Sequence, residues 1–220
     1  MHFEILVEDR SGKLALDILV PKIIGPEHSF HVHSYKGLGR VPKNLTPGTD
    51  PRHRILLDQL PRLLSGYGAA FANDPPEYRR AVVVVCDLDD KCLRSFRKEL
   101  IAVLSSCARQ PRAHFCVAIE EGEAWLLGDQ AALRAAYPKV KLQVLTTYTQ
   151  DSICGTWEKL ADAVYQGGAR ALIALGWQAV GQEKSRWAQT IGPMMDVSRN
   201  RSPSFQYLVT SLQMLSVGDS

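Results

Sequence analysis

The sequence predicts an α/β protein with a mostly parallel central sheet, flanking helices and a helical C-terminal extension. Two observations support this fold class. In the first 120 residues, short β-branched stretches alternate with helix-length segments, which is the pattern of βαβ units. Beyond residue 123 the apolar residues recur mainly with helical spacing. At 220 residues, the chain is long enough to build one substantial core.

Four strands are expected in the first half of the chain. The clearest is AVVVVC at 81–86, because a continuous β-branched run is typical of a central parallel strand with both faces buried. The run at 29–35 alternates instead, and we interpret its His31 and His33 as an ordinary edge-strand pair rather than as zinc ligands. In chain order, the expected strands are 3–8, 29–35, 81–86 and 113–119.

Helices are expected between and after these strands. Ser11 is a suitable cap for the first helix, and a Gly- and Pro-rich loop at 35–51 precedes the second. We expect an α/β core at 1–125 and a helical region at 126–220 that packs on it within one compact domain. In chain order, the expected helices are 12–24, 53–72, 91–108, 123–136, 156–166, 168–180, 183–195 and 203–215.

The composition argues against several classes of protein. No apolar run approaches the roughly 20 residues that span a bilayer, and acidic residues stand where a signal peptide needs a basic start. These features predict a cytoplasmic protein without a membrane segment. The five cysteines include no CxxC pair, so reduced thiols are expected rather than a zinc site. The net charge of +3 is too small to indicate nucleic-acid binding by itself.

Acidic residues follow three of the predicted strands. Glu8 ends the first, Asp87 and Asp89 follow the central one, and further acids at 120–123 follow the next. Parallel sheets bind ligands at the carboxyl ends of their strands, and hard divalent cations prefer oxygen ligands. Because residues i and i+2 of an extended chain point to the same side, the D-x-D spacing suits one ion. The structural alternative is that such acids cap helices, as Asp89 could.

Several segments resemble known proteins. A strand ending in Glu, ILVE at 5–8, and a later strand ending in DxD, VVVVCDLDD at 82–90, resemble the Toprim domain of topoisomerases, primases and OLD-family nucleases. Over nearly its whole length, the chain also resembles the Toprim-like bacterial family called domain of unknown function 4276. The segments that carry this second resemblance are VEDRSGK at 7–13, SYKGLGR at 34–40, VVVCDLDD at 83–90, AIEEGEAWLLGD at 118–129, and KSRWAQTIGPMMD with NRSPSF at 184–205.

The resemblance implies a site for Mg²⁺ or Mn²⁺. In the Toprim pattern the Glu, here Glu8, acts as general acid or base beside the metal, and the Asp pair, here Asp87 and Asp89, holds the ion. Glu123 lies in the GEAW segment and is expected as a further metal ligand or supporting acid. Asp9 stands where Toprim domains usually carry Gly, and its side chain restricts the approach of a phosphate.

Members of this family are often encoded beside ABC- or SMC-like ATPases, in arrangements that suggest anti-phage defence. The resemblance therefore implies a nuclease effector that acts on DNA or RNA under the control of an ATPase partner, and homo-oligomerisation stays open. Two alternatives remain: a non-catalytic module that binds nucleic acid or the ATPase, and an enzyme of small phosphorylated metabolites. The residues expected to bind phosphate or nucleic acid are Lys13, Lys36, Arg40, Lys184 and Arg201.

Overall fold

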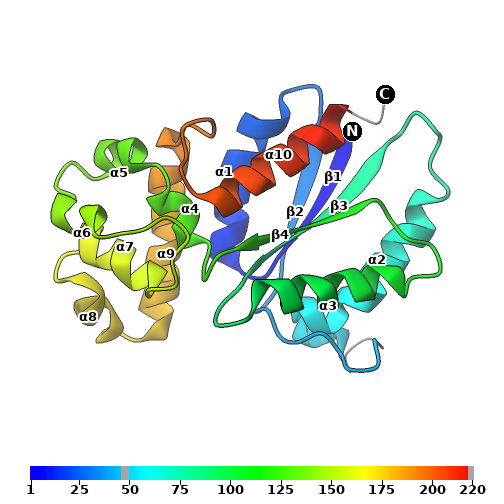
Figure 1. Ribbon diagram of the computed structural model, residues 1–220, viewed down its shortest axis with the longest axis horizontal. Helices are drawn as coiled ribbons and strands as arrows, with labels where there is room; N and C mark the ends of the chain where they lie inside the picture. Colours follow the sequence, from blue (N-terminus) through cyan, green and yellow to red (C-terminus); the bar gives the residue numbers. More distant parts are fainter. Residues whose placement is uncertain (46–49, 218–220) are drawn as a thin grey trace.

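The computed structural model describes residues 1–45 and 50–217 and shows the predicted α/β fold (Figure 1). Within these residues, one sheet has the strand order β2-β1-β3-β4, and every neighbouring pair is parallel. Part of the predicted loop at 35–51, residues 46–49, lies outside the described residues. The strands are β1 (His2–Val7), β2 (Ser29–Ser34), β3 (Arg80–Asp87) and β4 (Ala113–Ala118).

The order of the strands follows from their side chains. The apolar runs of β1 and β3 occupy the centre, and five consecutive residues of β1 are buried. The alternating strand β2 lies at one edge, as expected. There the rings of His31 and His33 stack with their centroids 4.2 Å apart. The side chain of Lys13, from α1, also contacts this edge strand, where its Nζ donates a hydrogen bond to Val32 O over 2.9 Å.

Helices cover both faces of the sheet. One face packs against α1 (Arg10–Ile24) and α10 (Pro203–Val217), and the other packs against α2 (Leu56–Phe71) and α3 (Leu93–Ser105). In Figure 1, α10 crosses one side of the sheet while α2 and α3 lie on the other. The last helix of the chain therefore completes the layer around the N-terminal sheet.

The remaining helices form a lobe beside the C-terminal ends of the strands (Figure 1). Helix α9 joins the two parts, because it packs along α1 and also contacts α4, α5 and α8. Within the described ranges, no helix is both long and apolar enough to cross a membrane. The elements of this lobe are α4 (Glu123–Leu127), α5 (Gln130–Ala136), α6 (Leu142–Thr146), α7 (Thr156–Val164), α8 (Gly168–Ile173) and α9 (Trp177–Ile191).

Three expectations about the helices are wrong. The cap of α1 is Asp9, whose Oδ1 accepts a hydrogen bond from Gly12 N over 2.7 Å, rather than Ser11. The single helix expected at 123–136 is two, because Asp129 caps a new helix by accepting from two backbone N–H groups. The expected break near 180–183 lies earlier, at Gly176, whose φ of 90° ends one helical segment before α9 begins.

Candidate active site

The C-terminal ends of the strands bring the predicted acidic residues to one edge of the sheet. Glu8 follows β1, and Asp87 ends the neighbouring strand β3. Strand β4 lies on the other side of β3, with Asp87 in register with Ala118. The loop after β4 then leads to Glu123 at the start of α4. We call this side of the sheet, where all four parallel strands end, the C-terminal edge.

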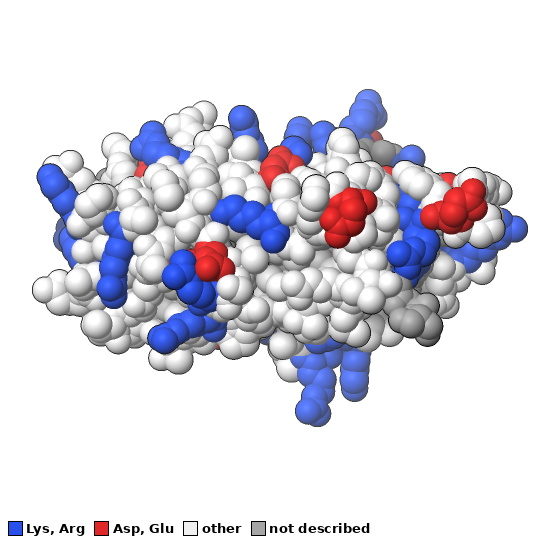
Figure 2. Space-filling model, turned by 90° about the horizontal axis from the view of Figure 1, so that it is seen from above, with Lys and Arg blue, Asp and Glu red and all other residues white. Residues whose placement is uncertain are grey.

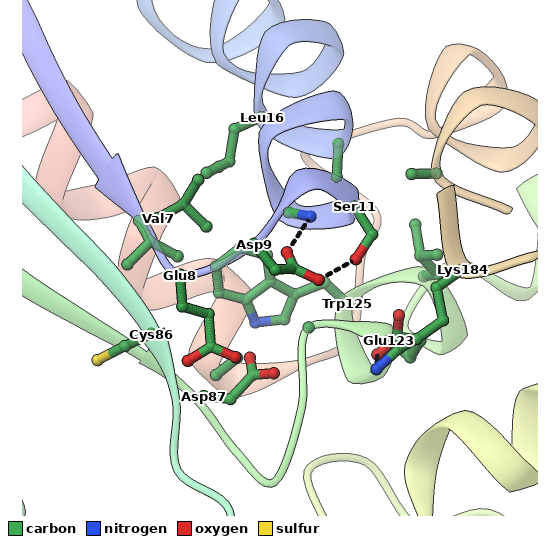
Figure 3. A pocket seen from close by; sticks show the side chains of 17 residues that line it. Val7, Glu8, Asp9, Ser11, Leu16, Cys86, Asp87, Glu123, Trp125 and Lys184 are labelled. Carbon is green, nitrogen blue, oxygen red and sulfur yellow. Dashed lines mark hydrogen bonds and ion pairs between the residues drawn. The ribbon is translucent and has the colours of Figure 1, made fainter. Parts of the chain in front are cut away.

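A small cavity opens at the C-terminal edge, and Figure 3 shows the side chains around it. Glu8, Asp87, Glu123 and Lys184 all line it, together with apolar side chains that include Trp125. The space open to a water-sized sphere is about 40 Å³, whereas one water needs roughly 10–15 Å³ on this scale. The cavity therefore has room for a few waters or a small hydrated ion, and a nucleotide is too large to enter.

The carboxyl groups of Glu8 and Asp87 face each other in this cavity (Figure 3). Burial raises the pKa of Glu8 to about 7, the negative charge of Asp9 adds to the rise, and hydrogen bonding with Asp87 partly offsets it. Burial and then the charge of Glu8 raise the pKa of Asp87 well above its usual range. Oε2 of Glu8 is buried without a hydrogen-bond partner. Two such acids need a shared proton or a cation to lie together.

Lys184 is the basic side chain among the residues that line the cavity, but other acids hold it. Its Nζ lies 3.1 Å from Oε2 of Glu123 and 3.6 Å from Oε2 of Glu121. Although burial lowers the pKa of Lys184, these two carboxylates raise it above its ordinary value. Burial nevertheless raises the pKa of Glu121 to about 7. Lys184 therefore balances mainly the α4 side of the site. It forms no ion pair with Glu8 or Asp87, and its charge offsets only part of the rise in the pKa of Asp87.

The loop after β2 also reaches the C-terminal edge. Gly37 N donates to Glu8 O over 2.8 Å, and Lys36 N donates to Arg54 O over 2.8 Å. The Arg54 guanidinium bonds Ser34 O at 2.7 Å. The backbone of this loop therefore lies beside Glu8, with Lys36 next to the residue that contacts it. Arg40 lies farther along this loop, where its backbone N–H bonds Oδ1 of Asp58.

Asp89 does not line the cavity. Strand β3 ends at Asp87, and Asp89 adopts a turn with a φ of 51°. Its carboxylate is half exposed and pairs with Lys91 Nζ at 2.7 Å. The prediction that Asp87 and Asp89 lie in one extended segment and point to the same side is therefore wrong. The negative charge of Asp89 still contributes to the raised pKa of Glu8, so the two residues are electrostatic neighbours.

Two other predicted phosphate contacts lie away from the cavity. Lys13 pairs with Asp17 at 3.0 Å, one turn along α1. The backbone of Arg201 bonds Gly128 O, and its side chain lines a separate open hollow with Arg134 and Arg199. Of the five residues predicted to bind phosphate, Lys184 lines the cavity, and Lys36 lies in the loop whose backbone contacts Glu8.

The sequence did not reveal what Glu120 does. Its carboxylate accepts hydrogen bonds from the backbone N–H groups of Cys154, Gly155 and Thr156, at the start of α7. Burial opposes ionisation, but these hydrogen bonds, led by that of the Thr156 side chain, lower the pKa of Glu120. The carboxylate therefore holds the end of β4 against α7. A sequence signal for this contact is lacking because the partners are more than thirty positions apart.

A second buried network holds Trp125 behind the cavity. Its indole Nε1 donates to Ser204 Oγ over 2.9 Å, and Asn200 Nδ2 donates to its backbone oxygen over 2.7 Å. Ser202 Oγ donates to Asp151 over 2.7 Å. The segments GEAWLLGD and NRSPSF, far apart in the sequence, therefore meet in one structure that positions α4 and Glu123.

The comparison with protein families gives one match. The family model described as "Domain of unknown function (DUF4276)" matches residues 7–213. No curated protein and no solved structure matches the chain.

Proposed function

The chain belongs to the DUF4276 family, and we propose that it is a metal-dependent phosphodiesterase that acts on nucleic acid. The observation that carries the proposal is the pair of facing carboxyl groups, Glu8 and Asp87, at the carboxyl ends of adjacent parallel strands. Both have raised pKa values, and strongly perturbed acids in a cleft are typical of functional sites.

The residues around the cavity fit Mg²⁺ or Mn²⁺. Glu8, Asp87 and Glu123 supply oxygen ligands, which such hard cations prefer. Oε2 of Glu8 has no hydrogen-bond partner, so its lone pairs are available to an ion. Within residues 1–45 and 50–217, no three His, Cys, Asp or Glu side chains form a ready-made metal cluster. Magnesium is commonly held by one or two carboxylates, with water and substrate completing its shell. Asp89 remains a proposed ligand.

Each side chain of the site has a proposed role. Glu8, with a pKa of about 7, suits a general acid or base, because proton transfer is most efficient when the pKa lies near the working pH. Asp87 and Glu123 would hold the ion, with Lys184 keeping the Glu123 carboxylate in place. A bound divalent cation would neutralise phosphate charge and lower the pKa of a water. Lys36 would hold a neighbouring phosphate.

A partner and a cellular setting belong to the same proposal: a cytoplasmic effector of anti-phage defence, controlled by an ABC- or SMC-like ATPase. The family resemblance and the charge distribution support it. The net charge is +3, and in Figure 2 the Lys and Arg side chains are scattered over the visible face without a continuous stripe. Phosphate contacts dominate nucleic-acid affinity, so help from a partner would be useful. Co-purification with a co-expressed neighbouring ATPase tests this part.

One observation favours a second candidate, a non-catalytic module that binds nucleic acid or the ATPase. Because both pKa values are raised, the Glu8–Asp87 pair can be stable with a shared proton and without any metal. The cap formed by Asp9 also places a side chain where the Toprim pattern has Gly. In that case divalent cations would not affect the fold.

Thermal melting with and without Mg²⁺ or Mn²⁺ separates the two candidates. An ion at about 100 times its dissociation constant adds about 2.7 kcal/mol to the native state, or roughly 5–10 °C for a chain of this size. We expect this rise in the wild type, its loss in Asp87→Asn and a reduced rise in Glu8→Gln. Asp89→Asn should also lose it, while its stability without metal changes by less than about 0.5 kcal/mol, since its pair with Lys91 is exposed and Asn tolerates the φ of 51° at this position.

The matched control is Asp90→Asn, which removes an exposed carboxylate three positions beyond Asp87 that does not line the cavity. This variant should keep the full metal-dependent rise. If neither ion raises the melting temperature of the wild type, or if Asp87→Asn keeps the rise, the metal-dependent function is wrong and the non-catalytic module stands.

A further inference from the structure

One side chain near the site is unusually exposed. Trp177 has 74% of its surface accessible, whereas Trp125, Trp157 and Trp187 have 6% or less. Building on the proposed function, we propose that the substrate is single-stranded and that one of its unpaired bases stacks on Trp177. This would make Trp177 a binding residue of the same site rather than part of the core.

Trp177 is held in place rather than free. Its ring lies 6.2 Å from that of Trp157, centroid to centroid, in an edge-on arrangement with an interplanar angle of 67°. Trp157 is itself buried in the core of the lobe. An aromatic ring that is anchored on one side and open on the other is the usual platform for a nucleic-acid base, because every base has a π-face.

Two independent connections link Trp177 to residues of the C-terminal edge. Along α9, Lys184 follows it by seven residues, so the two share a face of the helix about 10 Å apart along its axis. Lys184 contacts Glu123 in the cavity. Across the lobe, Trp157 lies in the first turn of α7, which Glu120 ties to the end of β4. Trp177 is therefore linked to the acidic site through Lys184 on its own helix and, across the lobe, through Trp157 and the Glu120 contact.

The size of the cavity determines where a substrate must lie. At about 40 Å³ it cannot accept a base, so a phosphodiester would lie across its mouth and the bases would remain outside. Lys184 and Trp177 are about 10 Å apart along α9, which is close to the length of three stacked nucleotides at roughly 3.4 Å each. A strand with a phosphate at the cavity could therefore bring one of its bases to Trp177. In a duplex the base faces are already stacked on each other. A single strand, by contrast, can offer a face to the indole.

Ile173 at the end of α8 and Leu175 in the turn before α9 are also exposed, so a docked protein is the competing occupant. Stacking and docking differ in what they demand of position 177. Stacking needs an aromatic ring, whereas an apolar protein contact accepts an aliphatic side chain of similar bulk. Trp177→Phe and Trp177→Leu therefore distinguish the two occupants.

The experiment measures the binding of a fluorescein-labelled oligo(dT) of about 12 nucleotides, within the usual site size for single strands, by anisotropy in EDTA and low salt. Trp177→Ala should bind about 5- to 150-fold more weakly than the wild type, which corresponds to about 1–3 kcal/mol for one stacked base. Trp177→Leu should resemble Trp177→Ala, while Trp177→Phe keeps most of the affinity. Leu175→Ala is the matched control and should bind as the wild type does. Binding to the annealed duplex should not depend on residue 177.

A second measurement uses the tryptophan itself. Because Trp177 is the exposed one of the four tryptophans, acrylamide should quench its fluorescence in the free protein, and bound oligo(dT) should protect it. Trp177→Phe should lose this protectable component. The proposal is overturned if Trp177→Leu binds as the wild type does, if Leu175→Ala is as weak as Trp177→Ala, or if the wild type shows no binding up to about 100 µM, the weak end of nonspecific affinity.

The outcome is independent of the metal test, because the oligonucleotide is measured without divalent ions. Binding that depends on Trp177 in a protein whose melting ignores Mg²⁺ and Mn²⁺ would leave the stacking site standing and overturn the metal-dependent function. A metal-dependent melting shift, together with oligonucleotide binding that does not depend on Trp177, would support the metal-dependent function and overturn the stacking site.

Discussion

Two glutamates, one within strand β1 and one just after it, have opposite surroundings. Glu4 is buried, and its carboxylate lies 2.7 Å from an Arg80 nitrogen and 2.8 Å from His33 Nε2. Burial would raise its pKa, but the hydrogen bonds with His33 and Arg80 lower it below the ordinary value. Glu8, four residues on, faces Asp87 instead, and its pKa rises to about 7. A compensated acid within β1 and an uncompensated one directly after it therefore lie four residues apart.

The difference teaches how to separate scaffold from site in this protein. A buried charge with full hydrogen-bonding partners contributes to the fold, and removing one partner is costly. A buried acid that faces another acid lowers stability, so it is expected where function requires it. The buried polar side chains of Asn200, Ser202 and Ser204 likewise contribute to the fold, because each of them makes hydrogen bonds. Glu8 and Asp87 are buried acids that face each other, so they belong to the candidate site.

The largest expected effect is on the free energy of unfolding, which should respond differently when Glu4 and Glu8 are replaced. Glu4→Gln leaves the guanidinium of Arg80 without its main charged partner, and we expect the free energy of unfolding to fall by about 3–5 kcal/mol. Glu8→Gln removes repulsion, so in EDTA it should leave stability unchanged or raise it. Denaturation by urea measures both. Equal losses in the two variants would mean that Glu8 is part of the scaffold.

The next effect concerns pH in the metal-free protein. Glu8 has a pKa near 7 when folded and near 4.5 when unfolded, so between these values the native state binds the extra proton. The contribution of Glu8 to stability should therefore fall as the pH rises from about 4.5 to 7, by about 3.4 kcal/mol for about 2.5 pKa units at 1.36 kcal/mol each, and then level off. Glu8→Gln should remove the part of the slope that Glu8 contributes, whereas Glu121, whose pKa is also about 7, and Asp87, whose pKa is raised as well, should keep the rest.

The pH profile has its own control in Glu4. Its pKa is lowered in the folded state, so it stabilises the fold above the unfolded value and loses this effect as the pH falls through the folded value. Glu4→Gln should therefore change the profile only on the acid side of about 4.5. A wild-type stability that is flat or rising between pH 4.5 and 7 in EDTA would contradict the uncompensated pair.

The smallest of the three effects concerns the buried network behind the cavity. Asn200→Ala removes the hydrogen bonds to Trp125 O and from Ser202 N and leaves these groups unsatisfied, which costs about 1–3 kcal/mol. Its metal-dependent melting shift should remain, since Asn200 does not line the cavity. Loss of that shift in a folded Asn200→Ala protein would show that the network tunes the site rather than only supporting it.

Much of the fold could be predicted from local patterns. The β-branched run at 81–86 indicated a central parallel strand, and the alternation at 29–35 indicated an edge. Parallel strands end on the same side of a sheet, which was enough to bring Glu8 next to Asp87. The family segments also pointed to Glu123 and Lys184, which the structure joins in an ion pair of 3.1 Å.

Other features depended on contacts between distant residues. Asp89 has the spacing of a partner for Asp87, but the turn after β3 directs it to Lys91. Glu120 belongs to the same acidic run as Glu123, yet it caps α7. Both outcomes follow from where a strand stops and which helix lies nearby. Local spacing does not contain that information.

The sequence by itself therefore determined the parallel sheet, the edge at which the acids gather and the residue types suited to a divalent cation, because these follow from side-chain periodicity and strand direction. The tertiary structure decided which acids are compensated and which are not. Burial and charge partners set a pKa, and these come from other elements: α9 supplies Lys184 to Glu123, and β3 sets Asp87 against Glu8. It also decided that Trp177 stays exposed while the other three tryptophans are buried.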